Sequence, residues 1–260
     1  MTTIAATEPT IHVDVVDGVA TIRIDRPPVN VLTIALLQRL EKAVSDLQSD
    51  DELRLIVLRG EGRVFSAGVD VGEHLGQWLV PMLDAFDRAA RALLASDIPT
   101  LAVVHGAALG GACELVALCD LVIAADNAKL GTPEITLGVT PPVAAAVFPS
   151  LVGRQRANAL VLTGELISGR DAADWGLVWR AVPADRLQEE AAAVVEQFRG
   201  RSAASLRLAK RTLGLSARLD LGAAISAADA EQRRALPGLA DGEEGLRAYL
   251  EKRAPRWSHR

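Results

Sequence analysis

Two glutamates, each preceded by a glycine-bearing turn, are the residues of this chain best suited to chemistry. Glu114 ends the run HGAALGGACE at residues 105–114, and Glu134 ends the run GTPE at residues 131–134. Carboxyl groups that are held in place transfer protons in general acid–base catalysis, and the apolar residues around Glu134 favour a raised pKa. The pair predicts proton transfer to or from a substrate. The structural alternatives are a solvated Glu114 and a Glu134 that caps backbone amides.

Backbone N–H groups beside glycines supply a second kind of chemistry. If Gly111 opens a helix, its N–H is an unpaired donor at the positive end of the helix dipole. A third turn, FSAGVD at residues 65–70, offers the N–H of Val69 as a partner, because Gly68 permits an unusual backbone angle. Two such N–H groups stabilise the oxyanion of a polarised carbonyl. Together with the carboxylates they indicate an enzyme of acyl thioesters.

The composition excludes several other classes of protein. The chain has 260 residues, half of them hydrophobic, which fits one large domain or a domain with an appendage. A net charge of −5 argues against nucleic-acid binding. The sequence has no uninterrupted apolar run of about 18 residues, so we expect no membrane span. No secretory signal opens the chain, and Cys113 and Cys119 are expected to be buried free thiols. We therefore expect a cytoplasmic protein.

The order of elements predicts an α/β core followed by helices. Residues 11–16 and 19–25 indicate a hairpin about Asp17-Gly18, and Thr33 is expected to cap a helix over 34–47. Further predicted elements are strands at 53–58, 100–104, 121–125 and 178–182, and helices at 78–95, 114–119 and 155–163. From 184 to 250 the pattern is helical, with breaks at Gly200, Gly214 and Pro237-Gly238. This arrangement predicts a fold of the α/β class with a helical C-terminal region.

Taken in this order, the three glycine segments resemble those of the enoyl-CoA hydratase/isomerase (crotonase) superfamily. The resemblance covers nearly the whole chain, including the segments RPPVNVL at 26–32, LTG at 162–164, AADWGLV at 172–178 and AYLEKR at 248–253. It implies a spiral of β-β-α turns over residues 1–195. It also implies a helical region over 196–260 that forms trimers, often paired into hexamers.

The resemblance also assigns roles to residues. Glu114 and Glu134 match the catalytic glutamates, and Val69 and Gly111 match the amides of the oxyanion hole. Residues expected to contact the substrate or its coenzyme A are Ala67, Gly68, Asp70, Gly110, Tyr249 and Lys252. The last two lie at positions that often complete the site of a neighbouring subunit.

Two departures from the family pattern concern the acyl group. His105 replaces an asparagine that many members carry, and we expect it to pack rather than to catalyse. After the second glutamate, common short-chain hydratases have a glycine-rich stretch, whereas this chain has LGVTPPVAAA at 137–146. That segment looks more like hydratases of cyclic dienoyl-CoA substrates. It is expected to shape the acyl pocket together with side chains around Trp78 and Leu79.

The predicted function is hydration of the C2=C3 bond of a 2-enoyl-CoA, with a cyclic dienoyl-CoA as one candidate substrate. It needs no metal or cofactor beyond the coenzyme A of the substrate. An enoyl-CoA isomerase is the alternative within the family, and a non-catalytic scaffold protein of the same fold is the alternative outside catalysis. A serine protease on a related spiral fold, using Ser66 or Ser150 with His105, leaves the paired glutamates unexplained. No nucleotide-binding loop or metal-ligand spacing is present.

Overall fold

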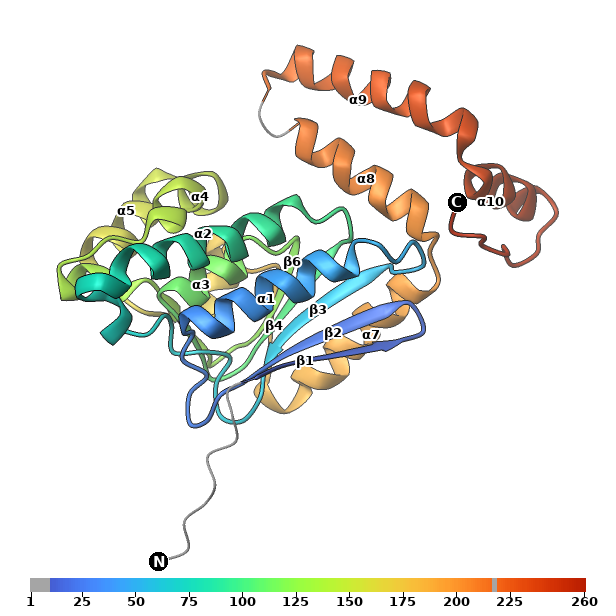
Figure 1. Cartoon of the computed structure of the whole chain (residues 1–260). Helices are drawn as coiled ribbons and strands as arrows, with labels where there is room; N and C mark the ends of the chain where they lie inside the picture. The colour runs from blue at the N-terminus through green and yellow to red at the C-terminus, as the bar shows by residue number, and fades with distance from the viewer. Residues whose placement is uncertain (1–9, 217–218) are drawn as a thin grey trace, which may run out of the picture.

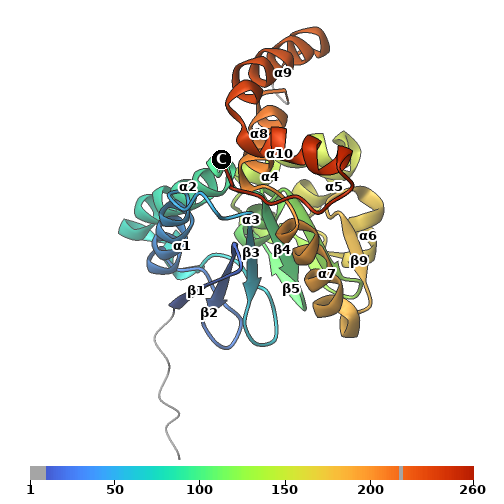
Figure 2. The same ribbon diagram turned by 90° about the vertical axis from the view of Figure 1, so that its right-hand side faces the viewer.

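The computed structural model describes residues 10–216 and 219–260, and its centre is a six-stranded sheet, whose strands are labelled across Figures 1 and 2. The first two strands are antiparallel and the others run parallel, in the order β1-β2-β3-β4-β6-β9. The strands are β1 (Thr10–Val16), β2 (Val19–Asp25), β3 (Leu55–Gly60), β4 (Thr100–Val104), β6 (Leu121–Ala125) and β9 (Arg180–Val182). Asp17 and Gly18 both have positive φ, which is the geometry of a tight hairpin turn. The predicted hairpin is confirmed.

Helices cover both faces of this sheet. Helix α1 (Ile34–Leu47) and helix α2 (Leu79–Ala95) pack together over one face, and α7 (Leu187–Arg199) lies on the other (Figures 1 and 2). The Thr33 side chain accepts from the Leu36 N–H and starts α1 as predicted. The buried face of α1 is a stripe of leucine and valine at helical spacing. These side chains shield the sheet beneath the helix from water.

A second, smaller group of elements surrounds the glutamates. A three-stranded sheet contains β5 (Ala107–Leu109), β7 (Lys129–Gly131) and β8 (Ile167–Ser168). The short helices are α3 (Gly111–Ala117), α4 (Pro142–Val152), α5 (Arg154–Thr163) and α6 (Gly169–Trp175). Strands of two or three residues carry too short a pattern to be predicted from the sequence. The helix predicted over 114–119 begins three residues earlier, at Gly111. Gly111 therefore opens the helix, which is the condition for its N–H to be an unpaired donor.

The C-terminal helices form an arm that projects from this body. It consists of α8 (Ala203–Ser216), α9 (Leu221–Ala235) and α10 (Ala240–Leu250), with a short 3-10 turn at Leu236–Gly238 (Figures 1 and 2). The break predicted at Gly214 is wrong, because α8 continues through that residue. Leu187 and Val194, in the first part of the predicted helical stretch 184–250, are buried in the core.

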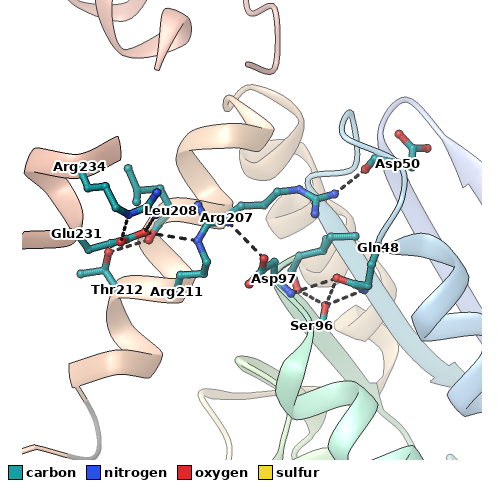
Figure 3. A network of polar contacts seen from close by, with 11 residues as sticks. Gln48, Asp50, Ser96, Asp97, Arg207, Leu208, Arg211, Thr212, Glu231 and Arg234 are labelled. Carbon is teal, nitrogen blue, oxygen red and sulfur yellow. Dashed lines mark hydrogen bonds and ion pairs between the residues drawn. The ribbon is translucent and has the colours of Figure 1, made fainter. Parts of the chain in front are cut away.

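Polar contacts fasten the arm to the body. Arg207 donates to the Asp50 carbonyl, while Arg211 pairs with Asp97 of the body and with Glu231 of α9 (Figure 3). Lys210 lies deeper, with its Nζ 2.7 Å from an Asp120 carboxylate oxygen. The root of α8 is therefore fixed by ion pairs and hydrogen bonds.

Two further expectations concern organisation. The division at 195/196 stays a prediction, and it falls within α7. In the described part of the chain, every helix is too short or too polar to cross a bilayer, and no group of three potential metal-ligating side chains occurs there.

Asn30 holds the loop that leads to the predicted oxyanion turn. Its side chain is buried, donates to the Glu61 and Val64 carbonyls at 2.7 and 2.9 Å, and accepts from the Arg26 N–H at 2.9 Å. Its φ is +53°, a region that asparagine tolerates better than most residues. The Asn30 side chain therefore supplies hydrogen bonds to backbone groups of this region in place of other backbone groups.

Asn30→Ala is therefore expected to lower the free energy of unfolding by about 2–3 kcal/mol, because buried backbone groups lose their partners. Urea unfolding followed by circular dichroism measures this. The control is Asp17→Ala, which has a similar positive φ at an exposed site where no side-chain hydrogen bond is found among the described residues. Equal losses in the two variants would show that backbone strain, and not the hydrogen bonds, accounts for the effect.

Candidate functional site

The predicted chemical groups meet around one cavity of about 120 Å³. Its walls come from the turn after Phe65, the N-terminal half of α2, the start of α3, and the segment from Pro133 to the start of α4. Its lining residues are Ala67, Gly68, Val69, Val71, His74, Met82, Leu83, Phe86, Gly110, Gly111, Glu114, Pro133, Glu134, Leu137, Val139, Thr140 and Pro142. The wall is mostly apolar with a few convergent polar groups, as in small-molecule sites generally.

Glu114 lies in the first turn of α3 and is only 2% exposed. Its Oε1 accepts from the Ala144 N–H, in the first turn of α4, at 2.8 Å. Burial raises the pKa of Glu114 to about 7, although the hydrogen bonds from the Ala144 and Val143 N–H groups oppose this and the charge of Glu134 adds to it. Near neutral pH this carboxyl group exchanges its proton readily.

Glu134 faces the same cavity from the 3-10 helix Pro133–Leu137. Burial raises its pKa, opposed by its own backbone N–H and by His74. A Cβ at Gly110 would lie 2.7 Å from its Oε1, and Gly110 has φ +56°, so only glycine lets the carboxylate approach this turn. The Oε2 atom is buried and has no hydrogen-bond partner within the described residues.

The two predicted amides are adjacent and unpaired. A Cβ on Gly111 would lie 2.7 Å from Cγ2 of Val69, which shows how closely the two turns approach. Leu32 bridges the residues on either side of Val69, since its N–H donates to the Gly68 carbonyl and its carbonyl accepts from the Asp70 N–H. Gly111 is the first residue of α3, so its N–H has no intrahelical acceptor. Within the described residues neither N–H donates to the protein.

Most of the sequence-predicted site residues come together here. Ala67, Gly68, Val69, Gly110, Gly111, Glu114 and Glu134 all line the cavity. Asp70 does not: its carboxylate accepts from the Gly72 N–H and lies 4.0 Å from Arg26. Tyr249, 81% exposed, and Lys252 are on the surface of the arm and do not line the cavity.

Several lining residues were missed. Side chains around Trp78 and Leu79 were expected at the acyl pocket, and the structure places Met82, Leu83 and Phe86 of the same helix there, one and two turns beyond Leu79; Trp78 and Leu79 themselves do not line the cavity. The helical spacing from Leu79 was the signal that could have found them. His74 and Val71 were also missed, because nothing in the loop pattern indicates which way its side chains point. The expectation for residues 137–146 holds for Leu137, Val139, Thr140 and Pro142.

The residues of the protease alternative have structural partners instead. His105 Nε2 lies 3.0 Å from the Gly62 carbonyl, and the Ser66 hydroxyl donates to the Asn30 carbonyl at 2.7 Å. Ser150 donates to the carbonyl of Val147 in its own helix. None of the three lines the cavity. Cys113 and Cys119 are free and buried, as predicted.

The arrangement suits proton transfer beside a polarised carbonyl. An oxygen atom near the Val69 and Gly111 amides would accept two hydrogen bonds, and both carboxyl groups would lie along the same acyl chain. Because the walls are apolar, charge that develops on the oxygen is screened less than in water.

Comparisons with known proteins show which family this chain is similar to. The family model described as enoyl-CoA hydratase/isomerase matches residues 14–260. A Mycobacterium leprae protein named "Probable enoyl-CoA hydratase" is 37% identical, over 96% of this chain and 98% of its own. The cyclohexa-1,5-dienecarbonyl-CoA hydratase of Thauera aromatica is 34% identical over 92% of each chain. The crystal structure of an enoyl-CoA hydratase from Bacillus anthracis superimposes with a TM-score of 0.91 at 30% identity, covering 96% of this chain and 99% of that one.

The raised pKa of Glu114 makes stability depend on pH. Between about pH 4.5 and 7 the folded chain holds a proton that the unfolded chain has released, so the free energy of unfolding falls as pH rises through this window. Glutamine cannot ionise, and its Oε1 can still accept from Ala144. The stability of Glu114→Gln relative to wild type should therefore rise by as much as about 3 kcal/mol between pH 4.5 and 7.5. Urea unfolding at several pH values measures this, with Glu52→Gln at an exposed site as the control. A difference independent of pH would contradict the buried ionisation.

Proposed function

The chain belongs to the enoyl-CoA hydratase/isomerase family, and we propose that it is an enoyl-CoA hydratase. It adds water across the C2=C3 double bond of a 2-enoyl-CoA thioester. The observation that carries this proposal is the meeting of Glu114 and Glu134, from different elements, beside the unpaired Val69 and Gly111 amides. An isomerase that moves a proton between two carbons needs only one such carboxylate, whereas hydration uses both.

The mechanism follows from this placement. The thioester oxygen accepts from the Val69 and Gly111 N–H groups, which stabilise the enolate-like transition state. A water molecule binds between the carboxyl groups. One carboxyl group, in its ionised form, takes the water proton as the oxygen attacks C3, and the other, protonated, delivers a proton to C2; we assign the first step chiefly to Glu114 and the second to Glu134. Burial raises the pKa of both groups, and their titrations are coupled, so the proton can lie on either carboxyl group.

We propose a compact acyl group, with a cyclic dienoyl-CoA as the leading candidate. The cavity approaches the size of an engineered 150 Å³ cavity that binds benzene. Leu137, Val139 and Pro142 make its wall apolar where common hydratases are glycine-rich. The name of the Thauera aromatica relative supports the same class of substrate.

No further cofactor is required by this proposal, because the carboxyl groups move the protons and the amides polarise the carbonyl. Coenzyme A enters as part of the substrate. The buried free thiols of Cys113 and Cys119 support a reducing, cytoplasmic compartment.

We also propose that the arm assembles the chain into a trimer or a pair of trimers. Apolar side chains on it are unusually exposed, among them Leu213 at 72%, Leu221 at 78% and Ile225 at 62%. Leu213 and Ile225 line a groove between α8 and α9. Exposed patches of this kind mark subunit contacts. Tyr249 and Lys252 would then complete a coenzyme A site on a neighbouring subunit.

The activity test is a screen of straight, branched and cyclic enoyl-CoA thioesters, following loss of the conjugated thioester absorbance. On the best substrate, Glu114→Gln and Glu134→Gln should each lower kcat by roughly 10²–10⁴-fold, as expected for positioned proton-transfer groups. Glu52→Gln, outside the cavity, is the matched control. Near-wild-type hydration in either cavity variant would refute the two-glutamate mechanism. If only the Glu134 change mattered, the isomerase reaction would be favoured.

Assembly is tested by light scattering. Wild type should have three or six times the mass of the chain. Leu213→Glu with Ile225→Glu should yield monomers, because a buried apolar contact cannot accommodate two carboxylates. KM for the thioester should rise as the shared coenzyme A site is lost. Leu94→Glu, which adds a charge on an exposed leucine of α2, is the control. A stable, fully active wild-type monomer would contradict this proposal.

A further inference from the structure

A second cavity, of about 240 Å³, lies outside the proposed active site, where the arm meets the body. Helix α8, the end of α9, the turn after α9 and the C-terminal tail form its walls, and Asp51 of the body completes them. Three arginines and one histidine line it, namely Arg207, Arg211, Arg234 and His259. Asp51 is the one carboxylate among the described residues of this lining, so the cavity wall is predominantly cationic.

Two of the arginines are held in place by carboxylates that lie outside the cavity lining. Arg234 donates from Nε and Nη2 to the Glu231 carboxylate, and Arg211 donates from Nη1 to Asp97 at 3.3 Å (Figure 3). Neither Glu231 nor Asp97 lines the cavity. These ion pairs therefore fix the two guanidinium groups without filling the space between them. Within the described residues, Nη1 of Arg234 and Nη2 of Arg211 make no hydrogen bond.

Arg207 has no carboxylate partner in the part of the chain that the structure describes. Its Nη2 donates to the Asp50 carbonyl, and its buried Nε has no hydrogen-bond partner there (Figure 3). Asp51 lines the same cavity but forms no ion pair with this guanidinium. A backbone carbonyl carries no net charge, so half-buried Arg207 is left without a counterion of its own.

His259 adds a neutral donor to the same wall. Its Nδ1 accepts from the Ala203 N–H at 3.2 Å. A backbone N–H only donates, so the neutral ring carries its hydrogen on Nε2. Its backbone is held as well, because the His259 N–H donates to the Asp241 carboxylate at 2.8 Å. Among the described residues, Nε2 has no acceptor, which leaves one fixed N–H available to a ligand.

We propose that this cavity binds a phosphate group, either inorganic phosphate or the phosphate of a small phosphomonoester. Guanidinium forks match phosphate oxygens in geometry and charge. A phosphate has enough oxygens to contact Arg207, Arg211 and Arg234 together, whereas a carboxylate has only two. The cavity is larger than an engineered cavity of about 150 Å³ that binds benzene, so part of the molecule that carries the phosphate fits too. The bound group supplies Arg207 with its counterion and joins the body, α8, α9 and the tail.

The site is tested on the full chain by calorimetry and thermal unfolding. The probes are inorganic phosphate and ribose 5-phosphate, and chloride at equal ionic strength is the blank. Both probes should raise the Tm of wild type, because a ligand that binds only the folded chain stabilises it. Equal affinities would identify the phosphate group alone as the ligand, and tighter binding of ribose 5-phosphate would place its sugar in the cavity as well. Binding of neither probe beyond the chloride blank would overturn the proposal.

A substitution then locates the binding. Arg207→Gln should raise the Kd for phosphate by on the order of tenfold, because a charged hydrogen-bond donor is lost. Arg233→Gln is the matched control, since it removes the same charge from α9 on a side chain that is 78% exposed and outside the cavity. If Arg207→Gln does not fold, Arg207→Lys decides, because it keeps the charge but loses the fork and should bind several-fold more weakly. Wild-type affinity in the Arg207 variant, or an equal loss in Arg233→Gln, would overturn the proposal.

Discussion

Desolvation of Glu114 is the constraint on which the rest of the site depends. A carboxyl group that is almost fully buried is costly to ionise, and here one strong hydrogen bond, from the Ala144 N–H, offsets part of that cost. The donor belongs to the first turn of α4, where free N–H groups and the helix dipole favour negative charge. The start of α4 must therefore lie beside α3. The segment between Glu134 and α4 is constrained at both ends by carboxyl groups of the site.

The Val69 and Gly111 amides must be oriented toward the substrate. A backbone N–H is oriented only when the backbone on both sides of it is fixed. Leu32 does this for Val69 through its two bridging hydrogen bonds, and Ser66 adds another by accepting from the Gly68 N–H at 3.1 Å. Asn30 ties the same region to the loop after β3. The N-terminal hairpin and its exit loop are thus part of the site's support, although none of their residues lines the cavity. Gly111 needs no such bracing, since helix α3 orients its N–H.

The C-terminal arm (α8, α9 and α10) combines a polar attachment to the body with an exposed apolar surface. Its root is fixed to the body by polar contacts of Arg207 and Arg211 (Figure 3) and of Lys210. Its far helices expose leucine and isoleucine. Polar contacts at the root set the direction of the arm without covering its apolar surface. The proposed assembly would bury that surface against other copies of the chain, and such assemblies usually have closed symmetry. The exposure of Tyr249, distant from the cavity lining in sequence and placed on the arm, is consistent with such an arrangement.

The sequence by itself determined the longer helices and strands and most of the site. Period-two and helical patterns found the hairpin, the main strands and α1, because burial of one face imposes those patterns. Glycine turns before Glu114 and Glu134, with Val69 and Gly111, were found because close backbone approach tolerates no Cβ. Only the tertiary structure decided which side chains meet across elements. It placed Met82 and Phe86 in the cavity wall, put His74 in the same cavity as Glu134, and continued α8 through Gly214. Those outcomes depend on how whole helices and loops rotate to fill the core, and a local pattern in the sequence contains no record of that rotation.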